Sequence, residues 1–162
     1  MPSPRSRPSR RAMIVMIVAM ALLAAAALFL PITGAQRSAP DAIAGVWSAD
    51  DGSSNLDFMR AAGGYQARIV YGRKLMEPDG VSFKRDALNP DPALRSRSMK
   101  NVVIVTGLRY DNGIWTGGSI YDATSGRTFR CMLWMKNGAL YLRGYFGLPL
   151  LGETRSFHRL AA

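Results

Sequence analysis

The stretch RDALNPDPALRSR combines acidic, amide and basic side chains between two strand-like segments, and it could support two kinds of chemistry. Asp86, Asn89 and Asp91 supply the oxygen atoms that Ca²⁺ prefers as ligands. Asp86 and Asp91 could instead exchange protons with a substrate while Arg95 or Arg97 holds an anion. A cation site and an acid–base site are therefore both candidates in this loop.

The same stretch also fits a purely structural turn, and we favour that interpretation. Its spacing is not that of an EF-hand, and no glutamate follows to complete a calcium shell. Asn-Pro starts a turn, and Asp91 before Pro92 is typical of a helix N-cap followed by a first-position proline. We expect one or two helical turns, with the two aspartates paired to the following arginines. The whole loop, residues 73–101, is long enough to form the rim of a pocket.

No other motif indicates a catalytic, metal or nucleotide site. The single histidine, His158, lies in the last predicted strand, and the single cysteine, Cys131, alternates with apolar residues. One cysteine excludes an internal disulfide, and its pattern is typical of a buried core thiol. The sequence has no histidine pair, no CxxC motif and no glycine-rich loop that opens a helix. We therefore predict no catalytic residue, no metal and no cofactor.

A second set of candidate ligand-binding residues comes from the later strands. Tyr141, Arg143 and Tyr145 alternate along one strand and share a face. Two polar-tipped rings around an arginine could line a cavity for an amphipathic anion; a solvated outer face is the alternative. The complete candidate ligand-binding set is Asp86, Asn89, Asp91, Arg95, Arg97, Tyr121, Asp122, Arg143 and Tyr145.

The elements that must position these residues are strands, because period-2 alternation dominates the chain after residue 44. DNG and KNG are strong two-residue hairpin turns. We predict an all-β fold, a meander of about eight antiparallel strands closed into a lipocalin-like barrel, with one long loop carrying a short helical turn. A two-sheet sandwich is the alternative. The predicted strands are residues 45–49, 55–60, 65–72, 102–110, 114–121, 127–135, 139–147 and 154–160.

The N-terminal segment has a different composition from the rest. Four arginines without an acid precede the eighteen apolar residues Met13–Leu30, and the small residues Thr33 and Ala35 precede Gln36. This order predicts a secretory signal peptide; an uncleaved membrane anchor is the alternative. Either one exports the remainder, which predicts a periplasmic location. The predicted divisions are 1–35 as signal peptide or N-terminal membrane anchor, 36–44 as a leader whose residues 36–42 are mobile, and 45–162 as a single β-barrel domain.

The charge of the chain favours anionic partners. Removing the four N-terminal arginines leaves 17 bases against 11 acids, a net charge of +6. The bases are scattered rather than clustered, which argues against nucleic acid. We expect a monomer that binds a small amphipathic or anionic ligand and touches the membrane transiently through its N-terminal segment.

Several spaced motifs resemble the bacterial exported family catalogued as domain of unknown function 2147. They are NPD with LRSR, GSIYDATSG and RGYFGLPLLG, and the resemblance spans Gly45 to Arg159. The chain departs from the family pattern at residues 98–101, at Ala123 in place of proline, and at Phe157 in place of tryptophan. These departures concern loop geometry more than the fold. The family has no assigned activity, so the resemblance implies no reaction.

Trp47 and Arg159 form a second resemblance, to the closing device of lipocalin-like barrels. There an arginine near the end of the last strand packs across a tryptophan of the first. A guanidinium can stack on indole while its donors bind strand carbonyls. Arg155 is the alternative partner.

Together these features predict an exported envelope protein that binds a small amphipathic or anionic molecule without catalysis. One alternative is an interaction or structural protein that acts through the 73–101 loop. The other is an enzyme that uses Asp86, Asp91 and Arg95.

Overall fold

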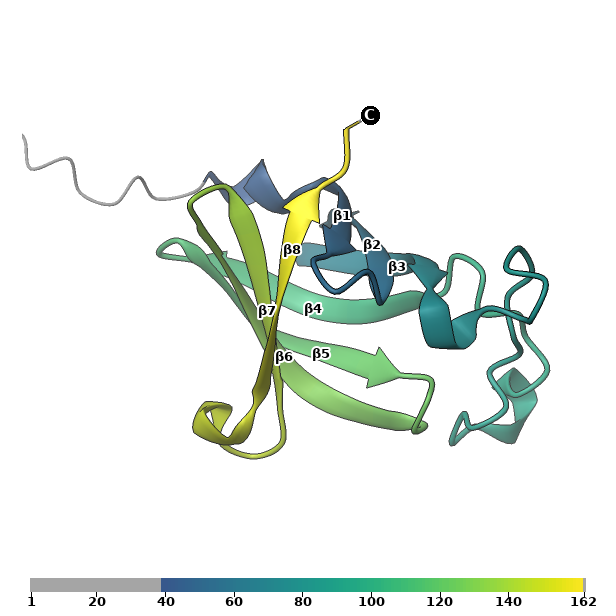
Figure 1. Ribbon diagram of the computed structural model, residues 1–162. Helices are drawn as coiled ribbons and strands as arrows, with labels where there is room; N and C mark the ends of the chain where they lie inside the picture. The colour runs from purple at the N-terminus through teal and green to yellow at the C-terminus, as the bar shows by residue number, and fades with distance from the viewer. Residues whose placement is uncertain (1–38, 162) are drawn as a thin grey trace, which may run out of the picture. The chain divides into compact units, whose positions relative to one another are not determined.

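The computed structural model describes residues 39–161. Within this range, eight antiparallel strands follow one another as a meander, and β1 pairs with both β2 and β8 to close a barrel (Figure 1). The strands are β1 Gly45–Ala49, β2 Ser54–Ala61, β3 Gly64–Gly72, β4 Val103–Asp111, β5 Ile114–Asp122, β6 Arg127–Lys136, β7 Ala139–Tyr145 and β8 Glu153–Arg159. This confirms the predicted all-β barrel over the sandwich.

Four short 3-10 helices complete the described chain. They are η2 Pro40–Ile43, η3 Arg73–Leu75, η4 Pro92–Leu94 and η5 Pro149–Leu151. No helix in residues 39–161 has the length and apolar character needed to cross a membrane. The predicted signal peptide or anchor, residues 1–35, lies outside the described residues.

The two Asn-Gly turns form hairpins as their composition predicts. Asn112 and Gly113 join β4 to β5 with φ of 49° and 96°, and Asn137 and Gly138 join β6 to β7 with φ of 52° and 79°. Positive φ at both central residues gives a turn whose twist matches that of the flanking strands. Local sequence therefore sets the register of these two hairpins.

Two strand glycines, Gly107 on β4 and Gly117 on β5, lie at an irregularity of the sheet. Gly107 and Gly117 have φ of 71° and 74°, and a Cβ on either would contact the carbonyl oxygen of the other at 3.8–3.9 Å. The β5–β6 register shifts between Trp115 and Gly118. Bulges of this kind increase the local twist and curvature of a barrel.

One end of the barrel is filled by side chains and covered by η2. Ile43, Trp47 and Trp115 are fully buried there. The Trp47 indole donates to the Ile43 carbonyl at 2.8 Å, and that of Trp115 donates to the Pro40 carbonyl at 3.0 Å. Pro40–Ile43 thus forms the short helix η2 within the predicted leader, residues 36–44, of which residues 36–42 were expected to be mobile. The reason is that this segment supplies both an apolar side chain and the acceptors that two buried indoles require.

At this closed end, Arg159 on the last strand packs against Trp47 on the first strand. Trp47 and Arg159 are register partners on β1 and β8, and the guanidinium carbon lies 4.4 Å from the centroid of the indole. The guanidinium donates to the carbonyls of Ala44 at 2.6 Å and Ala42 at 2.5 Å. This is the packing that the sequence predicts for a lipocalin-like barrel, and Arg155 takes no part in it.

Candidate functional site

A cavity of about 710 Å³ opens at the other end of the barrel, between the connections β1–β2, β3–β4, β5–β6 and β7–β8. This volume is typical of sites for small molecules. Its walls are strand side chains that face the barrel interior, whereas its rim comes from the connecting loops. The apolar wall includes Leu56, Ile69, Ile104, Ile120, Leu142 and Phe157.

The rim of the cavity is charged. Arg155 pairs with Glu153 at 3.2 Å, and Arg73 donates to the Asp51 carbonyl at 2.9 Å. Arg73 and Lys74 are exposed. The charged rim residues are Asp51, Arg73, Lys74, Asp122, Glu153 and Arg155. An apolar interior beneath a charged rim is the arrangement that an amphipathic molecule requires.

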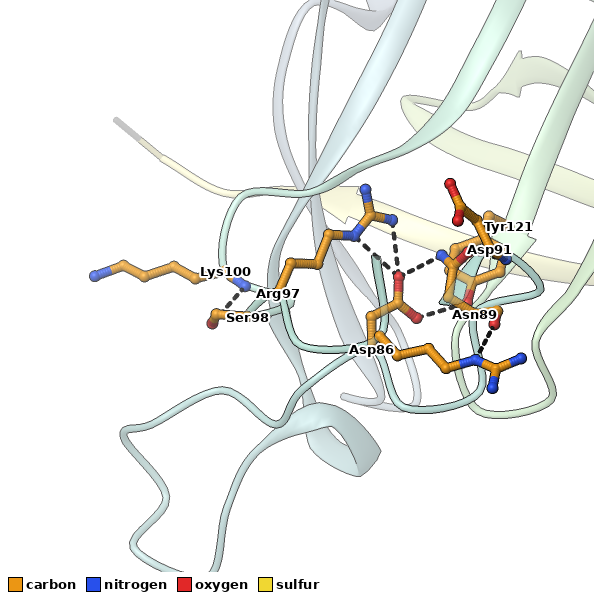
Figure 2. Close-up of polar contacts among 8 residues, drawn as sticks. Asp86, Asn89, Asp91, Arg97, Ser98, Lys100 and Tyr121 are labelled. Carbon is orange, nitrogen blue, oxygen red and sulfur yellow. Dashed lines mark hydrogen bonds and ion pairs between the residues drawn. The ribbon is translucent and has the colours of Figure 1, made fainter. Parts of the chain in front are cut away.

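The candidate residues of the β3–β4 loop are held together by a buried carboxylate (Figure 2). Asp86 is fully buried and accepts four hydrogen bonds. Its Oδ2 accepts from Asn89 Nδ2 at 2.7 Å and from Arg97 Nε and Nη2 at 3.0 and 2.8 Å. Its Oδ1 accepts from the Tyr121 hydroxyl at 2.6 Å.

The titration of this cluster follows from its contacts. Burial disfavours the charged form of Asp86, but hydrogen bonds from Tyr121, Asn89 and Arg97 outweigh it and hold the pKa of the carboxyl below its usual value. Burial and the hydrogen bond to Asp86 together raise the pKa of Tyr121 to about 12. Asp86 is therefore a stable anion and Tyr121 a stable donor.

The turn beside this cluster is capped as predicted. Asp91 Oδ1 accepts from the Ala93 amide at 2.9 Å and caps η4, which is a single 3-10 turn. Asn89 Oδ1 accepts from the Asp91 amide at 2.9 Å, and Arg95 Nε donates to the Asn89 carbonyl at 2.8 Å. Of the two expected aspartate–arginine pairs, Asp86 forms one with Arg97, while the Asp91 side chain binds backbone instead.

The Asp86 cluster pins the long loop to the barrel. Tyr121 belongs to β5, so its bond to Asp86 crosses from loop to strand. Met99 is fully buried in the core, and a Cβ at Gly126 of the β5–β6 turn would lie 2.1 Å from the Leu88 carbonyl oxygen. Loop and turn are thus in close contact. We interpret Asp86 as a structural clamp, because its carboxylate is buried and occupied by four donors.

The remaining candidates divide between the rim and the outer surface. Asp122 lines the cavity, and its carboxylate accepts from Thr124 and from the Ser125 hydroxyl at 2.7–2.9 Å. Burial opposes its ionisation, but these hydrogen bonds outweigh burial and lower its pKa. Tyr121 and Tyr145 also line the cavity. The lining does not include Asp86, Asn89, Asp91, Arg95, Arg97 or Arg143.

Arg143 lies on the outer side of β7 because it alternates with the interior Leu142. Its guanidinium donates to the carbonyls of Pro149 at 2.5 Å and Leu150 at 2.9 Å, and to Thr154 Oγ1 at 2.6 Å. These bonds brace the β7–β8 loop.

Residues 45–159 match the family model described as "Uncharacterized protein conserved in bacteria (DUF2147)". The chain belongs to this family. No curated protein matches it. Among solved structures it is similar to HP1028 from the human pathogen Helicobacter pylori, described as belonging to the lipocalin family. The TM-score is 0.64 at 25% identity, over 74% of this chain and 83% of that one.

The motifs that carry the DUF2147 resemblance all lie at the open end of the barrel. NPD and LRSR build the Asp86 clamp, GSIYDATSG supplies Tyr121 and the β5–β6 turn, and RGYFGLPLLG supplies the β7–β8 loop. Phe157, one of the departures, lines the cavity. Within the described residues, no three His, Cys, Asp or Glu side chains come together as a metal-binding group.

Sequence reasoning missed the rim bases Arg73, Lys74 and Arg155 as candidates. Their signal was weak because single bases at strand ends are common on surfaces. They become neighbours only because a meander brings alternate connections to one end of the barrel.

Proposed function

We propose that this DUF2147 barrel binds one small amphipathic or anionic molecule in the cavity at its open end, without catalysis, in the bacterial periplasm. The observation that carries the proposal is the 710 Å³ cavity with its apolar wall and charged rim. Eight-stranded barrels have room for one small ligand, as in lipocalins, and the likeness to a lipocalin-family structure supports the same use here. The export-like N-terminal sequence supports the location.

The cavity sets how such a ligand would lie. An apolar tail would gain about 25 cal/mol for each Å² that it buries against the interior side chains. A negatively charged head would remain at the rim, where Arg73 and Lys74 are exposed. The rim acids are already engaged, since Glu153 pairs with Arg155 and the Asp122 carboxylate binds its own turn.

Gly144 offers a direct test of the cavity. It lines the cavity on β7, and a Cβ there would approach Ile120 Cγ2 at 3.7 Å, an ordinary van der Waals contact with another wall side chain. Gly144→Leu should therefore fill the mouth without straining the strand. Thr128→Leu, on an exposed position of β6, is the matched control.

The experiment is an equilibrium titration with a fluorescent fatty-acid probe, dansyl-undecanoic acid. We expect saturable binding at one site in the natural chain and in Thr128→Leu. Gly144→Leu should weaken probe binding by about tenfold or more, since a loss of about 1.4 kcal/mol in binding free energy already has that effect. Equal binding by Gly144→Leu would place the probe elsewhere and contradict the proposal.

The preference for a negative head is tested separately. Lys74→Gln should weaken binding of the fatty-acid probe but not of the matching uncharged alcohol. Lys136→Gln, at the last residue of β6 beside the closed-end Asn137-Gly138 turn, removes the same charge outside the cavity lining and should change neither. Equal effects of the two substitutions would indicate only a dependence on net charge.

A further inference from the structure

The β7–β8 loop displays a group of large apolar side chains to solvent. Phe146 is 80% exposed, Leu148 67%, Leu150 85% and Leu151 76%. Isolated exposed apolar residues are ordinary on protein surfaces, but several together usually mark an interaction site. We call these four side chains the apolar loop.

The apolar loop is held in shape with its side chains outward. Arg143 donates to the Pro149 and Leu150 carbonyls, and these bonds tie η5 to β7. The loop returns to β7 so closely that a Cβ at Gly152 would lie 2.5 Å from the Gly144 carbonyl oxygen. Because the backbone is tied down, the leucines cannot turn inward by a small loop shift. The exposure is therefore built into the fold.

The apolar loop stands at the open end of the barrel. Phe146 and Leu151 line the cavity mouth, on the same rim as Arg155, Arg73 and Lys74. The loop connects β7 and β8 beyond the end of the strands, so its turn projects from the barrel (Figure 1).

We propose that the apolar loop inserts into the interface of an anionic phospholipid bilayer and brings the cavity mouth to the membrane surface. A projecting turn with four separate apolar side chains suits a lipid surface, because fluid lipids can rearrange around each inserted side chain. A protein partner would need a matching pocket. Partial insertion of leucine and phenylalanine beside basic side chains is the usual basis of interfacial binding. The net charge of +6 on the chain from Gln36 complements anionic headgroups.

This proposal goes beyond ligand binding, because docking does not depend on whether the cavity holds a molecule. It also does not depend on the apolar segment before Gln36. Within residues 39–161, every buried core residue lies between Ile43 and Phe157, so the chain from Gln36 includes the whole described barrel core and can be tested alone.

The first experiment measures co-sedimentation of this chain with vesicles of phosphatidylcholine containing phosphatidylglycerol. The test variant is Leu148→Asn with Leu150→Asn, and the matched control is Val81→Asn, which changes an 80% exposed apolar side chain in the β3–β4 loop. We expect the double variant to lower the partition coefficient by about tenfold or more and the control to leave it within about twofold. Pure phosphatidylcholine should bind the natural chain more weakly.

The second experiment locates the insertion. Cys131 is fully buried and burial raises the pKa of its thiol to about 12, so a thiol introduced by Leu150→Cys can be labelled selectively with an environment-sensitive dye. Emission from this label should shift to the blue when anionic vesicles are added, whereas a label on Val81→Cys should not shift. No vesicle binding, equal loss from Val81→Asn, or an unshifted Leu150→Cys label would each overturn the proposal.

Discussion

The hydroxyl of Tyr121 donates a 2.6 Å hydrogen bond to the Asp86 carboxylate and so ties the β3–β4 loop to β5. Asp86 is fully buried, and its other acceptor sites bind Asn89 and Arg97. We interpret this polar cluster as a clamp between the β3–β4 loop and Tyr121, the one member that also lines the cavity.

Breaking this clamp should destabilise the protein. Asp86→Ala leaves four donor groups of Asn89, Arg97 and Tyr121 without their acceptor, for which we expect a loss of about 3 kcal/mol in the free energy of unfolding. Tyr121→Phe removes one bond and should lose about 1 kcal/mol. Urea denaturation measures both. An Asp86→Ala protein as stable as the natural one would show that the clamp contributes nothing.

The clamp should also make stability depend on pH. The pKa of Asp86 is lowered in the folded state, so its contribution is complete above the ordinary carboxyl pKa of 3.8. It is lost as the pH falls below that value through the folded pKa. The natural chain should therefore lose more unfolding free energy than Asp86→Asn between about pH 5 and about pH 2. Parallel pH profiles of the two proteins would contradict the assignment.

The closed end should require the planar guanidinium of Arg159. Arg159→Ala removes the contact with the Trp47 ring and two hydrogen bonds to backbone carbonyls, and we expect a loss of about 2 kcal/mol. Arg159→Lys keeps the charge but lacks the planar pair of N–H groups that bind the two carbonyls, so it should recover less than half of that loss. Thermal unfolding measures the difference, and full recovery with lysine would show that charge alone suffices.

Arg143 should hold the apolar loop rather than bind ligand. Arg143→Ala should speed hydrogen exchange at the amides of Leu151 and Gly152, which donate to Leu148 and Pro149 at 3.1 Å. Each 1.4 kcal/mol of lost loop stability corresponds to about tenfold faster exchange. The amide hydrogens of the turn capped by Asp91 should exchange at an unchanged rate and serve as the internal control. A loss of probe binding with unchanged loop exchange would instead assign Arg143 to the ligand site.

The thiol of Cys131 should react only when the barrel opens. It is fully buried, and burial raises its pKa to about 12, so the thiolate is scarce at neutral pH. Reaction with a disulfide reagent in increasing urea should follow the unfolding transition. Rapid modification in buffer would show that the core beside β6 is accessible.

The elements that the sequence predicted well depend on local chemistry. Period-2 alternation located the strands, and Asn-Gly turns set two hairpins. The closing pair Trp47 and Arg159 is an exception, because it was inferred from the resemblance to lipocalin-like barrels. Asp91 was assigned as a cap because Asp-Pro has a definite local geometry.

The elements that were missed depend on contacts between distant segments. Pro40–Ile43 is ordered by acceptors that it offers to Trp47 and Trp115, which no local pattern reveals. Arg143 shares a strand face with Tyr141 and Tyr145, but its guanidinium turns to loop carbonyls that only the folded β7–β8 connection presents. The cavity rim combines four connections, so its charged set could not be assembled before the topology was known.

The central claim, that the open cavity carries a ligand, is tested most directly by native mass spectrometry of the protein purified gently from the cells that produce it. We predict a reproducible small-molecule adduct on the natural chain, with a polypeptide mass that begins at Gln36, and loss of that adduct in Gly144→Leu. Absence of any adduct from the natural chain, or an adduct retained equally by Gly144→Leu, would contradict the claim.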